Sequence, residues 1–238
     1  MIQIVTVSNN SALYDSVIGN NACMNRHFLQ VYDNSKENIG IPRRYNDFIK
    51  NKMKQDAWVV FCHQDFAFRE DITAKLAKLD NNCIYGPIGT GPTKQFIFIA
   101  AFSKYGIERF RMGFYDRTRK FGQILQSTAK KTQRMGNYIR KPMLVDTVDC
   151  CCLIVHSTLV NKYNLTFDEQ LDWHLYSEEF SLNAKHQYGI LTKAVQLDCI
   201  HLSGGNMDAG FDIALSYVRN KHSNRRFSAT CHDGYSVF

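Results

Sequence analysis

Long apolar runs are missing from this 238-residue sequence, and so is a basic leader at its start. No apolar stretch approaches the roughly 18 residues that a membrane-spanning helix needs. Residues 1–8 read as a short β-branched strand and not as a secretory signal. We therefore expect a soluble protein of the cytoplasm.

Paired metal-binding cysteines are also absent, although the chain contains 8 cysteines. None of them stands in a C-x-x-C spacing, which excludes the usual zinc site. Residues 150–152 are three consecutive cysteines, and neighbours in a strand point to opposite faces, so they cannot converge on one ion. We expect reduced, buried thiols that pack as small hydrophobic side chains, as in a reducing cytosol.

Glycine-rich phosphate loops and internal repeats are missing as well. Residues 86–92 contain three glycines and two prolines but match neither a P-loop nor a dinucleotide-binding fingerprint. We predict an ordinary loop there. The composition, 45% hydrophobic and 21% charged, is that of a folded globular chain and excludes general disorder.

Positive charge is concentrated in one stretch of the chain. The net charge is +7, but residues 104–141 contain eleven basic and two acidic side chains, a balance of +9 that leaves −2 for the remainder. Aromatic residues are interleaved with these charges. Such a segment attracts phosphates of a nucleic acid, an anionic membrane or a small molecule. We interpret it as a basic insertion, with a solvated helical face as the plainer alternative.

Strand and helix patterns alternate along the rest of the chain. This rhythm predicts an α/β fold with a mostly parallel central sheet flanked by helices. The expected strands are 2–7, 27–32, 57–62, 83–85, 143–155 and 190–196, and the expected helices are 11–19, 43–53, 70–79, 173–188 and 206–222. We expect a single domain over 1–223, made of a first half (1–100), the basic insertion (104–141) and a second half (142–223), followed by a loosely held tail (224–238).

Polar residues follow two of the expected strands and begin one helix. In doubly wound sheets, ligands bind beyond the carboxyl ends of the strands. Asp65 offers a hard oxygen ligand for Mg²⁺ or Mn²⁺, and His201 offers an imidazole. Glu178 and Glu179 would supply a general base. Each of these residues could instead have a purely structural role: Asp65 as a turn cap, His201 as a polar strand end, and the two glutamates as favourable charges at a helix start.

The order of these features resembles family 2 glycosyltransferases of the GT-A fold, and more narrowly their bacterial glycosyltransferase-like subgroup. The resemblance spans residues 1–205 apart from the basic insertion. The motifs that carry it are Tyr32-Asp33-Asn34, Tyr45-Asn46, His63-Gln64-Asp65, Val148-Asp149, Phe167-Asp168-Glu169, Trp173-His174-Leu175-Tyr176, Phe180-Ser181-Leu182-Asn183-Ala184, Gly189 and His201.

The resemblance implies that residues 1–100 are the nucleotide-binding half of the domain and residues 142–223 the acceptor-side half, and it implies a metal site and a donor site. Asp65 and His201 would hold Mn²⁺ or Mg²⁺, with His63 standing where the family has its first acid. The residues implied for binding the donor, a nucleotide-diphosphate sugar, are Asp33, Tyr45, Asn46 and Asp149.

The resemblance also implies the catalytic and acceptor-binding residues. Glu179 matches the catalytic base, with Glu178 beside it in reserve. Trp173 and His174 would meet the acceptor, Trp173 by offering an aromatic face to a sugar. The implied activity is inverting transfer of a hexose-type sugar to a hydroxyl of a glycan or a lipid-linked acceptor, as in polysaccharide biosynthesis.

Three ligands of the basic insertion stay open. Residues 104–141 would hold the donor diphosphate, an acceptor phosphate or the anionic inner face of a membrane.

Two alternatives to an active glycosyltransferase also stay open. The chain would be a non-catalytic nucleotide- or RNA-binding protein, or a degenerate glycosyltransferase in which His63 replaces a needed acid. No RNA-recognition motif is visible, so nucleic acid is not the expected partner.

Overall fold

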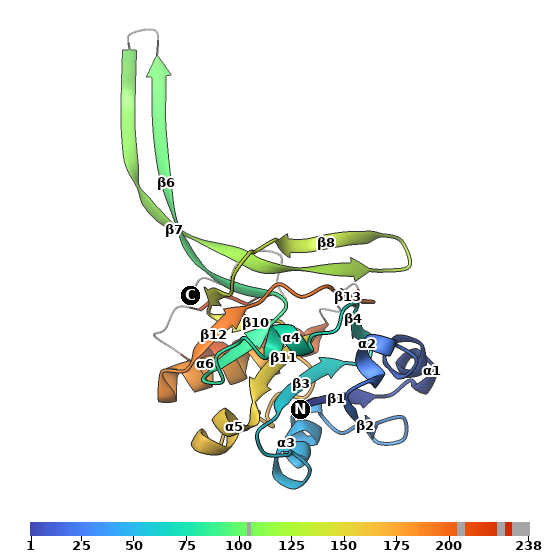
Figure 1. The fold of residues 1–238 in the computed structure, drawn as a ribbon. Coiled ribbons are helices and arrows are strands. Elements are labelled where there is room, and N and C mark those ends of the chain that lie inside the picture. The colour runs from blue at the N-terminus through green and yellow to red at the C-terminus, as the bar shows by residue number, and fades with distance from the viewer. Residues whose placement is uncertain (104–105, 204–207, 223–226, 230–238) are drawn as a thin grey trace.

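The computed structural model describes residues 1–103, 106–203, 208–222 and 227–229, and within 92–118 it describes the course of the backbone. The body is built on a seven-stranded sheet (Figure 1). Its strands are β1 (Ile2–Ser8), β2 (Phe28–Asp33), β3 (Trp58–His63), β5 (Cys83–Gly86), β9 (Met143–Val145), β11 (Cys152–His156) and β12 (Leu191–Ala194). They lie in the order β2-β1-β3-β11-β5-β12-β9.

Strand direction confirms the expected α/β class. β1 is parallel to both β2 and β3, and β5 is parallel to β12. β11 runs antiparallel to β3 and to β5, so those two strands share a direction, and β9 runs antiparallel to β12. Five of the seven strands therefore point one way. The apolar run of β3 is buried on both faces, as a central strand requires.

A second, six-stranded sheet contains a long hairpin formed by two of its strands, β6 (Gly89–Ser103) and β7 (Gly106–Ser127). The other strands of this sheet are β4 (Phe66–Phe68), β8 (Thr132–Asn137), β10 (Thr147–Val148) and β13 (Cys199–His201). They follow the order β10-β6-β7-β13-β4, and β8 pairs with β7. The outer part of β6 and β7 projects away from the body (Figure 1). The described part of the basic insertion thus consists of β7 and β8, the first paired with β6, and not of a helical face.

The loop predicted at residues 86–92 is largely strand. A side chain on Gly89 would come within 2.6 Å of the Thr147 carbonyl oxygen, and one on Gly91 within 2.9 Å of the Val145 Cα. These glycines therefore permit close approach of neighbouring strands, where the sequence analysis read them as turn residues.

Most predicted helices are present, with shifted ends. They are α1 (Ser11–Tyr14), which continues into a π-helical turn η1 (Asp15–Gly19), α2 (Ala22–Asn25), α3 (Ile41–Asn51), α4 (Thr73–Leu76), α5 (Ser157–Tyr163), α6 (Tyr176–Tyr188) and α7 (Ala209–Lys221). α6 ends at Gly189, whose φ of 69° is the left-handed cap that glycine favours. None of the helices in the described ranges has the length and apolar character needed to cross a bilayer.

The single strand predicted over 143–155 is wrong. The chain instead forms β9, β10 and β11, because it turns after β10. The amide of Asp149 donates to Ile88, and the amide of Cys152 donates to the carbonyl oxygen of Asp149, which closes the turn.

Hydrophobic side chains cover both faces of the central sheet. Alternate residues of β3 enter two separate clusters, with Val59 and Phe61 in one and Val60 and Cys62 in the other. Helices α3, α5, α6 and α7 contribute to the first cluster, and η1, α2 and α4 to the second. The cysteines of the described residues are free thiols and all but Cys23 are buried, as expected.

The predicted tail is partly packed into the body. Phe227, Ser228 and Ala229 are buried, and the hydroxyl of Thr147 donates to the Ser228 carbonyl oxygen at 2.6 Å. These three residues are therefore held and not loose. Residues 223–226 and 230–238 lie outside the described residues.

Candidate functional site

The carboxyl ends of β1, β2 and β3 meet at one edge of the central sheet. Val7 of β1 lies beside His63 of β3, and Ser8 lies beside Asp33 of β2. The side chain of Gln64 ties this edge together, since its Oε1 accepts hydrogen bonds from the Ser8 hydroxyl at 2.8 Å and from two backbone amides of the following loop. Residues at the ends of these strands therefore share one surface region.

A pair of short strands brings Asp65 and His201 together. β4 follows Asp65 directly and pairs antiparallel with β13, so that Phe66 lies opposite His201. The amide of Leu202 donates to the Asp65 carbonyl oxygen at 2.8 Å. Main-chain bonds thus place these two residues side by side, although they are far apart in the sequence.

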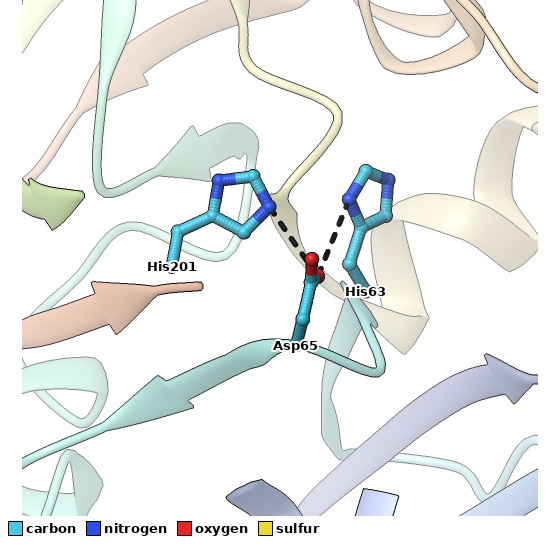
Figure 2. A group of neighbouring side chains, drawn as sticks. All are labelled: His63, Asp65 and His201. Atoms are coloured by element: carbon cyan, nitrogen blue, oxygen red, sulfur yellow. Dashed lines mark ion pairs between the residues drawn. The ribbon is translucent and has the colours of Figure 1, made fainter. Parts of the chain in front are cut away.

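His63, Asp65 and His201 form one cluster (Figure 2). Asp65 Oδ1 lies 3.3 Å from His201 Nε2 and 3.9 Å from His63 Nδ1. Figure 2 shows the two imidazole rings on either side of the carboxylate. One ligand atom from each of the three residues lies within 4.8 Å of the others. The structure therefore unites the three residues expected to bind a metal.

The cluster has perturbed protonation equilibria. Burial, followed by the neighbouring charge of His201, lowers the pKa of His63 to about 4. Burial also lowers the pKa of His201, but the nearby carboxylate of Asp65 outweighs this effect and raises it above its usual value. Burial raises the pKa of Asp65, but the two histidines outweigh that effect and lower it. His63 is therefore a neutral imidazole at neutral pH.

The donor atoms suit a divalent cation. Two imidazole nitrogens and a carboxylate oxygen make a mixed N,N,O set, which transition ions accept more readily than Mg²⁺ does. His201 Nε2 is buried without a well-aligned hydrogen-bond partner among the described residues, despite its proximity to Asp65. A buried polar atom left in this state fits a ligand position.

Asp149 and His174 lie near the cluster. The charge of Asp149 acts on both cluster histidines and that of His174 acts on His63. Asp149 Oδ1 also accepts a hydrogen bond from the Cys151 amide at 2.9 Å. His174 Nε2 lies 3.3 Å from Asp208, the residue that caps α7. Both are thus positioned to meet a ligand that reaches the cluster.

Asp33 and Trp173 are the solvent-accessible members of the predicted site. Asp33 ends β2, and its Oδ1 accepts a hydrogen bond from the Ser35 amide at 2.8 Å. Hydrogen bonding to the side chain and backbone of Ser35 lowers the pKa of Asp33. Trp173 precedes α6 and is 39% exposed. Both side chains are available for contact with a ligand.

Tyr45 and Asn46 are occupied by structural contacts. Tyr45 is buried, and its hydroxyl donates to the Cys62 carbonyl oxygen at 3.1 Å. Asn46 exchanges hydrogen bonds with the backbone of Phe167 and also donates to Glu169. The expectation that Tyr45 contacts a donor is therefore corrected, because its ring and hydroxyl are used within the core.

Glu178 and Glu179 are both fully buried, which the sequence analysis did not foresee. Glu179 Oε1 lies 2.7 Å from Lys221 Nζ and 3.5 Å from His222 Nε2, both at the end of α7. Glu178 Oε2 accepts a hydrogen bond from the Cys150 thiol at 2.9 Å. Neither carboxylate belongs to the metal-type cluster found among the described residues, and neither reaches solvent in this conformation.

Two residues with a place in the site were not singled out from the sequence. The hydroxyl of Tyr176 lies 2.7 Å from His63 Nε2. Lys221 pairs with both Glu179 and Asp168. Tyr176 stands in the motif shared with family 2 glycosyltransferases, so that motif was an available signal. Lys221 lies beyond the region of resemblance and gave none.

Comparison with known proteins shows which solved structures have a similar fold. No protein-family model and no curated protein matches the sequence. Residues 1–349 of TarS from S. aureus align with a TM-score of 0.54 and 11% identity over 95% of this chain and 66% of theirs. The same TarS segment in complex with UDP gives 0.51 and 10% over 85% and 60%. GalNAc-T7 with UDP, GalNAc and Mn²⁺ gives 0.53 and 10% over 92% and 47%.

These proteins are glycosyltransferases of the GT-A fold, and the chain shares that fold. It spans about two thirds of TarS 1–349 and less than half of GalNAc-T7. At such low identity the likeness concerns the fold alone.

Proposed function

We propose that this protein is a metal-assisted glycosyltransferase of the family 2 type, which moves a sugar from a nucleotide-diphosphate sugar to an acceptor hydroxyl. The observation that carries the proposal is the meeting of His63, Asp65 and His201 beside the carboxyl-end edge of a GT-A sheet. Solved relatives in fold contain UDP, and one of them also contains Mn²⁺.

The three residues would hold the cation through two nitrogens and one oxygen. When bound, a divalent cation neutralises the charge that develops on a departing diphosphate. The absence of a second carboxylate at His63 makes Mn²⁺ the better candidate and Mg²⁺ the weaker one. A site in which His63 replaces the first acid would therefore still bind a metal ion, but it would prefer Mn²⁺ to Mg²⁺.

Donor binding is assigned to the residues around the strand edge. Asp33 is exposed at the end of the strand next to β1, where its carboxylate would accept hydrogen bonds from a nucleoside. Asp149 would approach the donor sugar beside the metal. Trp173 and His174 precede α6, and their aromatic rings suit the faces of an acceptor sugar.

The catalytic base is assigned to one of the adjacent carboxylates of α6. An inverting transfer needs a group that takes the proton from the attacking hydroxyl. Glu179 holds the matching motif position and Glu178 is its neighbour. Because both are buried and partnered, an acceptor meets either one only after a shift of α6 or α7. Replacing the base, as Glu179→Gln or Glu178→Gln, should reduce transfer about 10²–10⁴-fold, while the other variant keeps most activity.

The projecting hairpin is assigned to an anionic membrane surface that carries a lipid-linked acceptor. Its support is the net charge of +5 on residues 89–127, which form β6, β7 and their connection and overlap the basic insertion (104–141), together with the extension of β6 and β7 away from the body (Figure 1). Binding to anionic vesicles that weakens with added salt, with no binding to neutral vesicles, is the expected result. Equal binding to both vesicle types contradicts this assignment. If the hairpin binds an anionic membrane as proposed, the protein works at the inner face of that membrane.

Calorimetric titration of UDP and GDP, with and without Mn²⁺, tests the proposed function. We expect nucleotide binding that requires Mn²⁺ in the wild type and disappears in Asp65→Asn. Asp212→Asn is the matched control, because Asp212 is an exposed acid on α7, away from the cluster. Failure of the wild type to bind either nucleotide with Mn²⁺ overturns the proposal. Metal-independent binding of RNA in its place favours the non-catalytic alternative.

A further inference from the structure

The hydroxyl of Tyr176 stands between a cluster histidine and the backbone. Tyr176 is the first residue of α6 and is completely buried. Its oxygen lies 2.7 Å from His63 Nε2 and donates to the Cys150 carbonyl oxygen at 3.2 Å. His63 therefore has one ring nitrogen at Tyr176 and the other, Nδ1, on the side of Asp65.

Counting hydrogens decides which nitrogen of His63 carries its proton. A tyrosine hydroxyl has one hydrogen, and a carbonyl oxygen only accepts. A tyrosine hydroxyl has an ordinary pKa of about 10, so it keeps that hydrogen at neutral pH. If the hydrogen goes to Cys150, then His63 must donate from Nε2 to the tyrosine oxygen. Both contacts are satisfied at once only in this arrangement.

The opposite tautomer satisfies fewer groups. A hydrogen on Nδ1 would face Asp65 Oδ1 at 3.9 Å, which is too long for a hydrogen bond. The tyrosine hydrogen would then turn to Nε2 and leave Cys150. The contacts therefore favour a hydrogen on Nε2 and an unprotonated Nδ1 beside the carboxylate, where Figure 2 shows a ring nitrogen of His63 directed at Asp65.

The backbone before Tyr176 is held in an unusual conformation. Leu175 has a φ of 57°, in the left-handed region that a leucine rarely adopts, and its side chain is buried. Such a conformation persists where the surrounding structure over-determines it. It starts α6 so that Tyr176 faces His63, and it links the helix of the two candidate bases to the cluster.

We propose that Tyr176 is a positioning residue for the metal site, which holds His63 in the Nε2–H tautomer and so presents Nδ1 to the cation. The inference rests on the proposed function, because it assigns a partner to one of the metal ligands. A hydrogen bond to the far nitrogen commonly fixes the ring orientation of a ligating histidine, and loss of such a partner weakens metal affinity about 10–100-fold.

Tyr176→Phe removes the hydroxyl and little else, and Tyr85→Phe is its matched control. Tyr85 is also buried, it packs in the hydrophobic cluster on the other face of the sheet, and its hydroxyl donates to the Asp80 carbonyl oxygen at 3.1 Å. Titration with Mn²⁺ alone should show affinity about 10–100-fold lower in Tyr176→Phe. Tyr85→Phe should bind Mn²⁺ as the wild type does. Equal affinity in all three proteins overturns the inference.

The tautomer itself is measured in the metal-free wild type by the ¹⁵N chemical shifts of the His63 ring. We expect Nε2 protonated and Nδ1 unprotonated, with a mixture of tautomers in Tyr176→Phe. A wild-type ring protonated on Nδ1 overturns the inference. This measurement is made on the wild type, so it does not depend on whether Tyr176→Phe folds. Failure of the wild type to bind Mn²⁺ counts instead against the proposed metal-assisted function, since the tautomer is read without metal.

Discussion

The side chain of Asn46 forms a two-way bridge to the backbone of Phe167. Its Oδ1 accepts from the Phe167 amide at 2.8 Å, and its Nδ2 donates to the Phe167 carbonyl oxygen at 2.9 Å. Phe167 is buried and stacks on Phe180 of α6 at 4.5 Å. One amide on α3 therefore fixes the segment that leads into Trp173 and α6.

Asn46→Ala should lower the free energy of unfolding by about 1–3 kcal/mol, because it leaves two buried backbone groups without partners. Urea denaturation measures the effect. Asn51→Ala is the control: Asn51 is an exposed residue of the same helix whose side chain donates to Asp47 on the surface, so its replacement should change stability by about 0.5 kcal/mol or less. Indistinguishable midpoints for the two variants would show that the bridge is not a stabilising element.

Asp168 should make stability depend on acid pH. Burial raises the pKa of Asp168, but hydrogen bonds from Lys221 and Tyr217 outweigh it and lower the pKa below its usual value. A carboxyl with a lowered pKa stabilises the fold above its unfolded pKa of about 4, and this stabilisation is lost as the pH falls through its folded pKa. Asp168→Asn should therefore cost about 1–3 kcal/mol at pH 7 and progressively less towards pH 3. A difference from wild type that stays constant between these pH values contradicts the assignment.

The Lys221–Glu179 pair should show energetic coupling. Lys221→Met leaves the buried carboxylate of Glu179 without its ammonium partner, which should cost about 2–3 kcal/mol. That is less than for a wholly buried pair, since the lysine is one third exposed. The double variant Lys221→Met/Glu179→Gln should cost less than the sum of the single changes. Denaturant titration of the four proteins gives the coupling, and strict additivity would refute it.

Gly122 should be far less replaceable than Gly189. Both have positive φ, 82° and 69°, but a Cβ on Gly122 would lie 2.1 Å from the Pro87 carbonyl oxygen, whereas one on Gly189 meets nothing within 4 Å. Gly189→Ala should cost about 1–2 kcal/mol from backbone conformation alone. Gly122→Ala adds a clash with main chain and should cost clearly more. Thermal denaturation compares them, and equal losses would exclude the clash.

The sequence predicted the metal-type cluster because topology leaves little freedom there. Parallel strands end at one edge of a sheet, so residues that follow β3 must reach that edge, and the strand-end position of His201 indicated the same edge, while the resemblance to family 2 glycosyltransferases added His63. The surroundings of Glu179 could not be predicted in this way. Its partner Lys221 comes from α7, beyond the resemblance, and an acid near a helix start reads alike whether it faces solvent or a buried ammonium.

The strand at residues 89–92 could not be predicted for a different reason. Glycine occurs both in loops and where neighbouring strands approach closely, and only the three-dimensional proximity of Gly89 to Thr147 shows that the second case holds here. Likewise, the apolar stretch at 143–155 hides its turn, because the turn is made by backbone bonds of Asp149 and Cys152 and not by proline or glycine.

The pairing of β4 with β13 has a consequence for how the molecule is assembled. Asp65 and His201 become neighbours only when β13, the last strand among the described residues, joins a strand from the first third of the chain. This pairing closes a loop of well over a hundred residues, so the three-residue cluster is the product of a long-range contact and has an entropic cost that a local motif does not have. Any substitution that weakens the pairing of β4 with β13 should therefore disperse the cluster without touching one of its side chains.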